Sequence, residues 1–403
     1  TRYIGVTGVQ TCALPISLLV TGQGKGGRSF VAVDVTDISD SLTEDEIAGR
    51  VLWEFTHPDM GFSFGRPLIA KTRRWGWVVI LTGGYNNIGG TKPGQGALFI
   101  LNAKTGELLG SSPVYTGSDS GSASSPSGFA QVEGYTPSYQ DYTLDYVYGG
   151  DLKGNLWRFD FSNPADDLPP VTRIAEFSTG GVGQPITTAP KIEYSADDLK
   201  RYVFVGTGRL LSSEDQGNTQ QQSMYAVRDG TKTRAFGSKP YQVPFPSGGF
   251  FPVTRSNLVE VTDLIEGAKL DSAKPMGWRY DLTGSNAGVT ERVILSLQAN
   301  DGVVTWVGSI MNDDPCNASG NAIVYAVHYG TGQSVLYKLE SGLYKQVEMT
   351  DPIVGGLADT TLVRVGSSIR VLGTDVKGKS SIYGNTVSES GEPRVVNWRI
   401  IRE

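Results

Sequence analysis

The sequence predicts an all-β protein, a modified β-propeller of six to seven blades, from three observations. A strand–turn–strand pattern is clearest in residues 145–160, where β-forming residues flank a turn rich in glycine. Looser copies occupy residues 83–109 and 202–230, and recurrence every few tens of residues is typical of propellers. Glycine is abundant, with 52 among 403 residues against a usual share of about 7%. Helical patterns are nearly absent, and only residues 41–50 suggest a short helix.

We expect six repeated β units in chain order, each made of short runs of β-branched and aromatic residues between polar or glycine-rich turns. The strands expected in units one to three span residues 18–20, 29–35, 51–55, 68–70, 77–81, 97–101 and 146–161. Those expected in units four to six span residues 202–205, 223–227, 292–295, 303–307, 322–327, 361–365 and 369–373. Residues 239–290 are irregular, and we interpret them either as a degenerate blade or as an insertion that caps a blade.

Four tryptophans fall on expected strands: Trp53, Trp77, Trp157 and Trp306. A propeller blade buries both faces of its sheet against the neighbouring blades. Large rings at these positions are therefore expected to fill the seams between blades rather than to form an exposed binding surface.

The first sixteen residues are expected to lie outside the domain. Residues 6–16 look like a translated sequencing adapter, and the alternative is a natural loop with an odd cysteine. We therefore take residues 17–403 as the propeller domain and expect its natural N-terminus to be missing. With Cys12 set aside, Cys316 has no partner in the sequence, so it either pairs outside this sequence or lies buried.

Composition and motifs argue against several classes of protein. The net charge is -6 and no Lys/Arg cluster occurs, so nucleic acid is not an expected partner. The two histidines, His57 and His328, stand in a turn-like segment and at a strand end, where structural or surface roles are expected. No nucleophile with an adjacent base is visible, so we expect no catalytic residues. An acidic run within residues 34–46 could coordinate a cation but is more typical of a solvated loop.

Several segments, in this order, resemble the PilC/PilY family, whose members assist type IV pilus assembly and sit at the pilus tip. The segments are residues 29–37, 51–55, 61–71, 145–160, 205–212, 312–316 and 396–399. The resemblance is to the C-terminal β-propeller of the family and leaves out its variable N-terminal adhesive region. It implies a non-catalytic pilus-biogenesis factor and tip-associated adhesin scaffold that supports pilus extension and opposes retraction.

The resemblance also implies partners and a location. The expected partners are type IV pilins and minor pilins, together with a host or abiotic surface contacted through the missing N-terminal region. The expected location is outside the cytoplasm, at the pilus tip, the outer membrane or the cell surface of a Gram-negative-type bacterium.

The family places a calcium loop just before the third unit, with a pattern that resembles Asp-x-Asn-x-Asp-Gly-x-x-Asp. On this sequence the loop is residues 137–145, and Asp141 and Asp145 match its third and last acidic positions. Calcium takes about six to eight oxygen ligands. The resemblance therefore implies calcium as a cofactor, held by the Asp141 and Asp145 carboxylates with the Thr143 carbonyl.

The same loop departs from the family pattern at three positions. Pro137 and Tyr139 replace the first two ligands, and Tyr142 replaces the glycine that allows the sharp bend. The calcium site is accordingly expected to be degenerate. The alternative is a plain turn in which Asp145 caps the following strand.

A quinoprotein dehydrogenase is the alternative from a different class. Residues 96–106 are close to the repeat of pyrroloquinoline-quinone propellers. Such an enzyme would usually need eight blades, a calcium-bound quinone and a stacking tryptophan, often with a pair of adjacent cysteines. No such pair occurs here and fewer blades are predicted, so the non-catalytic interpretation is preferred. An exported scaffold propeller without known partners is a third interpretation.

Overall fold

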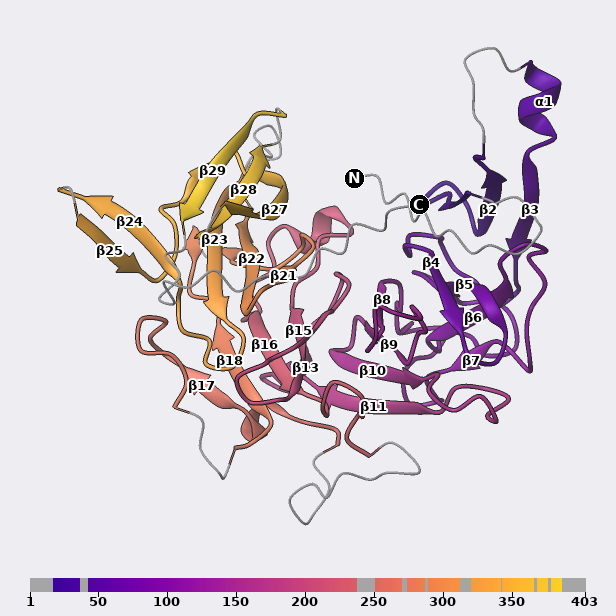
Figure 1. Ribbon diagram of the computed structural model, residues 1–403, viewed down its shortest axis with the longest axis horizontal. Helices are drawn as coiled ribbons and strands as arrows, with labels where there is room; N and C mark the ends of the chain where they lie inside the picture. Colours follow the sequence, from indigo (N-terminus) through magenta and orange to yellow (C-terminus); the bar gives the residue numbers. More distant parts are fainter. Residues whose placement is uncertain are drawn as a thin grey trace.

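The computed structural model describes residues 17–36, 43–237, 251–269, 274–286, 289–311, 320–341, 343–365, 368–375 and 378–385. Strands make up 46% of the chain and helices 3%. The described residues form six sheets of three or more strands. Figure 1 shows these sheets following one another in chain order around an arc, with the indigo first sheet and the yellow last sheet at its two ends.

The first three sheets are antiparallel meanders, in which strands that follow one another in the chain also pair with one another. The first sheet contains β1 (Leu18–Gly22), β2 (Ser29–Asp34) and β3 (Val51–Thr56). The second contains β4 (Leu68–Thr72), β5 (Gly76–Thr82), β6 (Ala97–Asn102) and β7 (Val114–Tyr115). The third contains β8 (Val132–Tyr135), β9 (Tyr146–Gly150), β10 (Asn155–Asp160) and β11 (Val171–Glu176).

The later sheets are less regular, because their strand order departs from the chain order. The fourth has the order β14 (Lys191–Tyr194), β15 (Arg201–Gly206), β16 (Ser223–Arg228), β18 (Gly277–Asp281) and β17 (Val259–Val261), with β17 and β18 parallel. The fifth has the order β21 (Gln298–Asn300), β22 (Val303–Ile310), β23 (Asn321–His328) and β26 (Ile353–Val354). The sixth has the order β25 (Leu343–Val347), β24 (Leu336–Glu340), β29 (Ser380–Asn385), β28 (Ser368–Asp375) and β27 (Leu357–Val365).

Short elements complete the described fold. Two small hairpins pair β12 (Ser178–Thr179) with β13 (Val182–Gly183), and β19 (Ser285–Asn286) with β20 (Val289–Thr290). The helix expected near residues 41–50 is confirmed as α1 (Glu44–Ala48). Its N-terminus is capped by Thr43, whose hydroxyl accepts the Glu46 N–H at 3.4 Å while the Glu46 carboxylate accepts the Thr43 N–H at 2.8 Å. None of the described helices is both long and apolar enough to cross a membrane.

Most expected strands are confirmed, and two expectations are wrong. Residues 292–295 do not form a strand, because the buried Arg292 guanidinium donates to backbone carbonyls of a neighbouring loop and only one bridge, to Ser309, is made. The described part of residues 239–290 does not form a separate blade, since it supplies β17 and β18 to the fourth sheet. The adapter-like residues 1–16, the 312–316 segment with Cys316 and the 396–399 segment lie outside the described residues.

The core lies in the seams between successive sheets. Five clusters of buried hydrophobic residues each combine side chains from two consecutive sheets, from the first pair to the last. Trp157 packs in the seam between the second and third sheets and is 4% exposed. Trp53 and Trp306 are also buried, whereas Trp77 is only partly buried. The seam positions predicted for three of the four tryptophans are therefore confirmed.

Candidate functional site

The loop of residues 137–145 connects β8 to β9 and lies against the end of β4 in the preceding sheet. Lys71 and Thr143 form a parallel bridge, in which the Leu144 N–H donates to the Lys71 carbonyl at 2.8 Å. The Asp145 N–H donates to the Tyr135 carbonyl of β8 at 3.0 Å. The second and third sheets therefore hold this loop between them.

Asp145 is buried, with 4% of its surface exposed, and its carboxylate accepts a hydrogen bond from the Arg73 guanidinium. Burial raises the pKa of Asp145, and the positive charge of Arg73 opposes that shift. Arg73 follows β4 directly in the turn that leads to β5. The Arg73 guanidinium thus binds the Asp145 carboxylate, which the resemblance assigns as a calcium ligand.

Asp141 has a different set of partners. Its side chain is exposed, and its Oδ1 accepts the Thr143 N–H at 3.1 Å in a local turn. That backbone hydrogen bond lowers the pKa of Asp141. The Lys71 Nζ lies 3.5 Å from the Asp141 carbonyl oxygen. The two carboxylates therefore belong to one loop but bind different donors.

The backbone of the loop keeps the bend that the family pattern requires. Tyr142, at the position of the family's glycine, adopts a φ of 53°, which favours glycine. Tyr139, at the second ligand position, is 76% exposed. Because Asp145 is bound to Arg73 and the first two ligands are absent, the donor set as arranged does not fit a calcium ion. Calcium binding by Asp141, Thr143 and Asp145 stays a prediction, which a calcium titration of the protein would test.

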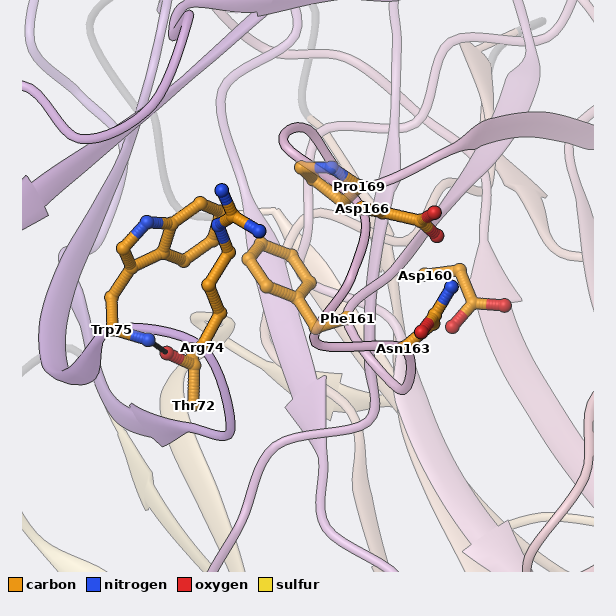
Figure 2. A pocket seen from close by; sticks show the side chains of 8 residues that line it. All are labelled: Thr72, Arg74, Trp75, Asp160, Phe161, Asn163, Asp166 and Pro169. Carbon is orange, nitrogen blue, oxygen red and sulfur yellow. Dashed lines mark hydrogen bonds between the residues drawn. The ribbon is translucent and has the colours of Figure 1, made fainter.

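The same seam continues into a small pocket lined by both polar and apolar side chains (Figure 2). In the close-up, Thr72, Arg74 and Trp75 lie on one side, and Asp160, Asn163 and Asp166 lie on the other. The free volume is about 10 Å³, which is room for roughly one water molecule. The pocket lining is Thr72, Arg74, Trp75, Asp160, Phe161, Asn163, Asp166 and Pro169.

Arg74 links the second and third sheets across this seam. Its guanidinium donates to the Pro164 carbonyl at 3.0 Å and to the Asp167 carboxylate at 3.2 Å, and it lies 5.4 Å from the ring centre of Trp75. Arg73 and Arg74 were both missed by the sequence reasoning. The only available signal was the dense positive charge of residues 71–74, because each carboxylate partner lies 72 or more residues further along the chain.

A second charged cluster, also missed, lies in the seam between the third and fourth sheets. The buried Asp229 carboxylate accepts hydrogen bonds from Arg158 and from the Tyr148 hydroxyl, the latter at 2.7 Å. A second buried guanidinium, that of Arg201, lies 3.7 Å from Asp229 and 4.3 Å from the ring centre of Tyr146. One carboxylate and several aromatic rings therefore accommodate two buried positive charges.

The remaining predicted residues have structural partners. The His57 Nδ1 accepts the Asp59 N–H at 3.1 Å, and the His328 Nε2 lies 2.9 Å from the Asp197 carboxylate. Asp151 is fully buried in the β9–β10 turn. Among the residues that the structure describes, no group of three or more His, Cys, Asp or Glu side chains is arranged to hold a metal ion.

Comparisons with known proteins agree on one family. The model of the PilY1 beta-propeller domain matches residues 15–244. A type IV pilus biogenesis factor PilY1 homolog of Xylella fastidiosa is 30% identical over 321 residues, covering 78% of this chain and 24% of the relative. The type IV pilus biogenesis factor PilY1 of Pseudomonas aeruginosa strain PAO1 is 26% identical over 418 residues, covering 94% and 34%. The chain thus spans about a quarter to a third of these relatives.

The solved C-terminal domain of Pseudomonas aeruginosa PilY1 has the same fold. It superposes with a TM-score of 0.67 and 22% identity, covering 92% of this chain and 80% of that one. Together with the nearly all-β structure, this match confirms the predicted β-propeller class.

Proposed function

The chain belongs to the PilY1 family, and from this premise we propose that it is the β-propeller of a type IV pilus biogenesis factor. The single observation that carries the proposal is the family match over residues 15–244, which covers more than half of the chain. The names of the relatives support the same function. The propeller works by binding other proteins rather than by catalysing a reaction.

The finer role that we propose is a tip-associated adhesin scaffold. It supports pilus extension and opposes retraction from the pilus tip, the outer membrane or the cell surface. Its partners are type IV pilins and minor pilins, with a host or abiotic surface bound through a further region of the longer protein. The resemblance of the segments 61–71, 145–160 and 205–212 to the PilC/PilY family supports this role.

A quinoprotein enzyme is the competing proposal, based on the motif of residues 96–106. The end of this motif has a structural role in packing. In residues 102–106 the Asn102 Oδ1 accepts the N–H groups of Lys104 and Thr105 at 2.9 and 3.1 Å. Gly106 has a φ of 72°, and an added Cβ there would lie 2.5 Å from the Trp53 ring. The motif thus forms a tight turn seated on a buried tryptophan. Dye-linked alcohol oxidation with added quinone and calcium tests the competing proposal, and we expect no activity.

A domain exchange tests the pilus function. Residues 17–403 would replace the matching C-terminal domain of PilY1 in Pseudomonas aeruginosa, and surface pili and twitching motility would be measured. We expect the chimaera to restore a measurable part of both, and a Trp157→Ala chimaera to restore less because its core is disrupted. An exported, protease-resistant chimaera that restores neither would contradict the proposal.

A further inference from the structure

We infer that the Arg73 guanidinium takes the place of a metal cation in the 137–145 loop, so that the loop keeps its bend without calcium. This inference concerns the loop alone and does not depend on the proposed pilus function. It rests on the partner of Asp145, the backbone of Tyr142 and the anchoring of the loop to β4.

The first step is the charge balance at Asp145. A carboxylate that is 4% exposed needs a counter-charge or a proton. The Arg73 guanidinium supplies the counter-charge through a direct hydrogen bond, while its own side chain remains 34% exposed. A divalent cation at the same carboxylate would have to displace a positive charge already in contact with it, so the two cations compete.

The second step is the backbone. A left-handed residue that is not glycine persists only when the surrounding contacts hold it in place. Two hydrogen bonds fix the backbone next to Tyr142. The Thr143 N–H donates to the Asp141 side chain at 3.1 Å, and the Leu144 N–H donates to the Lys71 carbonyl at 2.8 Å. The bend is therefore maintained by protein contacts that involve no metal.

The third step is the placement of the cations. Lys71 lies near the end of β4 and Arg73 follows β4 directly in the turn, so both cations approach the loop from the second sheet. The Lys71 Nζ approaches the carbonyl of Asp141 and Arg73 binds the carboxylate of Asp145. Two positive side chains from the second sheet thus contact oxygens of the two aspartates that match the calcium pattern, one in the middle of the loop and one at its end.

Thermal unfolding of the full chain tests the inference, with either calcium or a chelator present. We expect the parent's melting temperature to be the same in both conditions. Arg73→Gln and Asp145→Asn should each lower it by roughly 3–6 °C, and the double variant by no more than the larger single effect, because both remove one contact. Asp119→Asn, which removes an exposed carboxylate from an ion pair with Arg173, is the control and should change little.

A calcium-dependent rise in the parent that Asp145→Asn abolishes would overturn the inference, because the loop would then bind the metal with Arg73 present. Fully additive effects of Arg73→Gln and Asp145→Asn would also overturn it. They would show that the two side chains do not act as a pair.

Rebuilding the loop gives a sharper second test. Pro137→Asp, Tyr139→Asn and Tyr142→Gly together restore the ligand and glycine positions of the family pattern. We expect isothermal titration to show at least about tenfold tighter calcium binding when Arg73→Gln is added to the rebuilt loop, a free-energy gain of about 1.4 kcal/mol. Equal affinity in the two rebuilt proteins would overturn the inference.

Discussion

At the scale of single residues, the carboxylate of Asp151 organises the hairpin on which the propeller prediction depended. It accepts the N–H groups of Lys153 and Asn155, the Asn155 side-chain amide and the Trp157 indole, each at 2.9 Å. Burial raises the pKa of Asp151 to about 6, and the four donors oppose that shift. One buried acid therefore fixes both the turn and the tryptophan in the adjacent seam.

We predict that Trp157→Ala lowers the free energy of unfolding by about 3–5 kcal/mol, because it leaves a cavity in the seam between the second and third sheets. Trp157→Phe keeps much of the ring but loses the hydrogen bond to Asp151, so a smaller loss of about 1 kcal/mol is expected from that bond. Urea unfolding measures both. If Trp157→Ala unfolds like the parent, the packing assigned to this seam is wrong.

Glu291 makes a second residue-scale prediction, on pH. It is fully buried; its Oε2 accepts the Gly284 N–H at 2.8 Å and the Tyr325 hydroxyl at 3.2 Å. Its Oε1 has no hydrogen-bond partner within the described part of the chain. The aromatic residues Tyr325 and Tyr280 of β23 and β18 pack together beside it. Burial raises the pKa of Glu291 to about 7 from its ordinary 4.5.

Because this pKa is higher in the folded than in the unfolded chain, the folded state holds the proton more tightly. The stabilisation is complete below about pH 4.5 and is lost as the pH rises through about 7. We predict that the free energy of unfolding of the parent falls by about 3 kcal/mol between pH 5 and pH 8 because of Glu291. Glu291→Gln should not show this fall. The measurement is the difference between parent and variant across urea titrations, since other buried acids contribute equally to both. Parallel pH profiles would contradict the prediction.

At the scale of elements, β10, β15 and β16 are tied together by charges as well as by apolar packing. Arg158 is on β10, Arg201 begins β15, and Asp229 follows β16 directly. All three are at least 98% buried, so their charges depend on one another and on the rings of Tyr146 and Tyr148. This seam joins the third sheet to the fourth, and so the first half of the arc to the second.

We predict that Asp229→Asn lowers the free energy of unfolding by about 3–5 kcal/mol, because it leaves two guanidinium groups buried without a counter-charge. Asp119→Asn is the matched control, since its ion pair with Arg173 is exposed and should contribute less than about 1 kcal/mol. Equilibrium denaturation in urea compares the two variants. Equal losses would show that burial does not set the strength of this cluster.

The sequence predicted these elements well where alternation and turn residues agree, as in β9 and β10. It failed at residues 292–295, where an apolar run precedes the strand and Arg292 is bound to carbonyls of another loop. It also could not assign β17 and β18, because their pairing depends on partners that are distant in sequence. The Arg73–Asp145 contact could not be predicted for the same reason.

At the scale of the whole molecule, the sheets at the two ends of the arc each expose apolar side chains. Leu19 and Val51 are 49% and 50% exposed, and strand register puts both on the same face of the first sheet through Val33. On the last sheet, Val363 and Ile382 are 37% and 50% exposed. Exposed apolar surface of this kind promotes association between proteins.

We predict that Leu19→Lys combined with Ile382→Lys reduces concentration-dependent association without lowering the melting temperature. Both side chains are half-exposed, so little core packing is lost. Val182→Lys, at a 60% exposed position in the β12–β13 hairpin, is the control and should leave association unchanged. Sedimentation velocity measures the oligomeric state. An equal effect of the control would argue for general solubility rather than for these two faces.

The seam-by-seam core also determines how cooperatively the domain unfolds. Each described hydrophobic cluster joins only neighbouring sheets, and none of the five combines the first sheet with the last. A linear series of nearest-neighbour interfaces frays from its ends, because a terminal unit has one stabilising neighbour where an internal unit has two. Amide hydrogen exchange should therefore be fastest in the first sheet (β1–β3) and in the sixth (β24, β25, β27, β28 and β29), and slowest in β9, β10, β15 and β16.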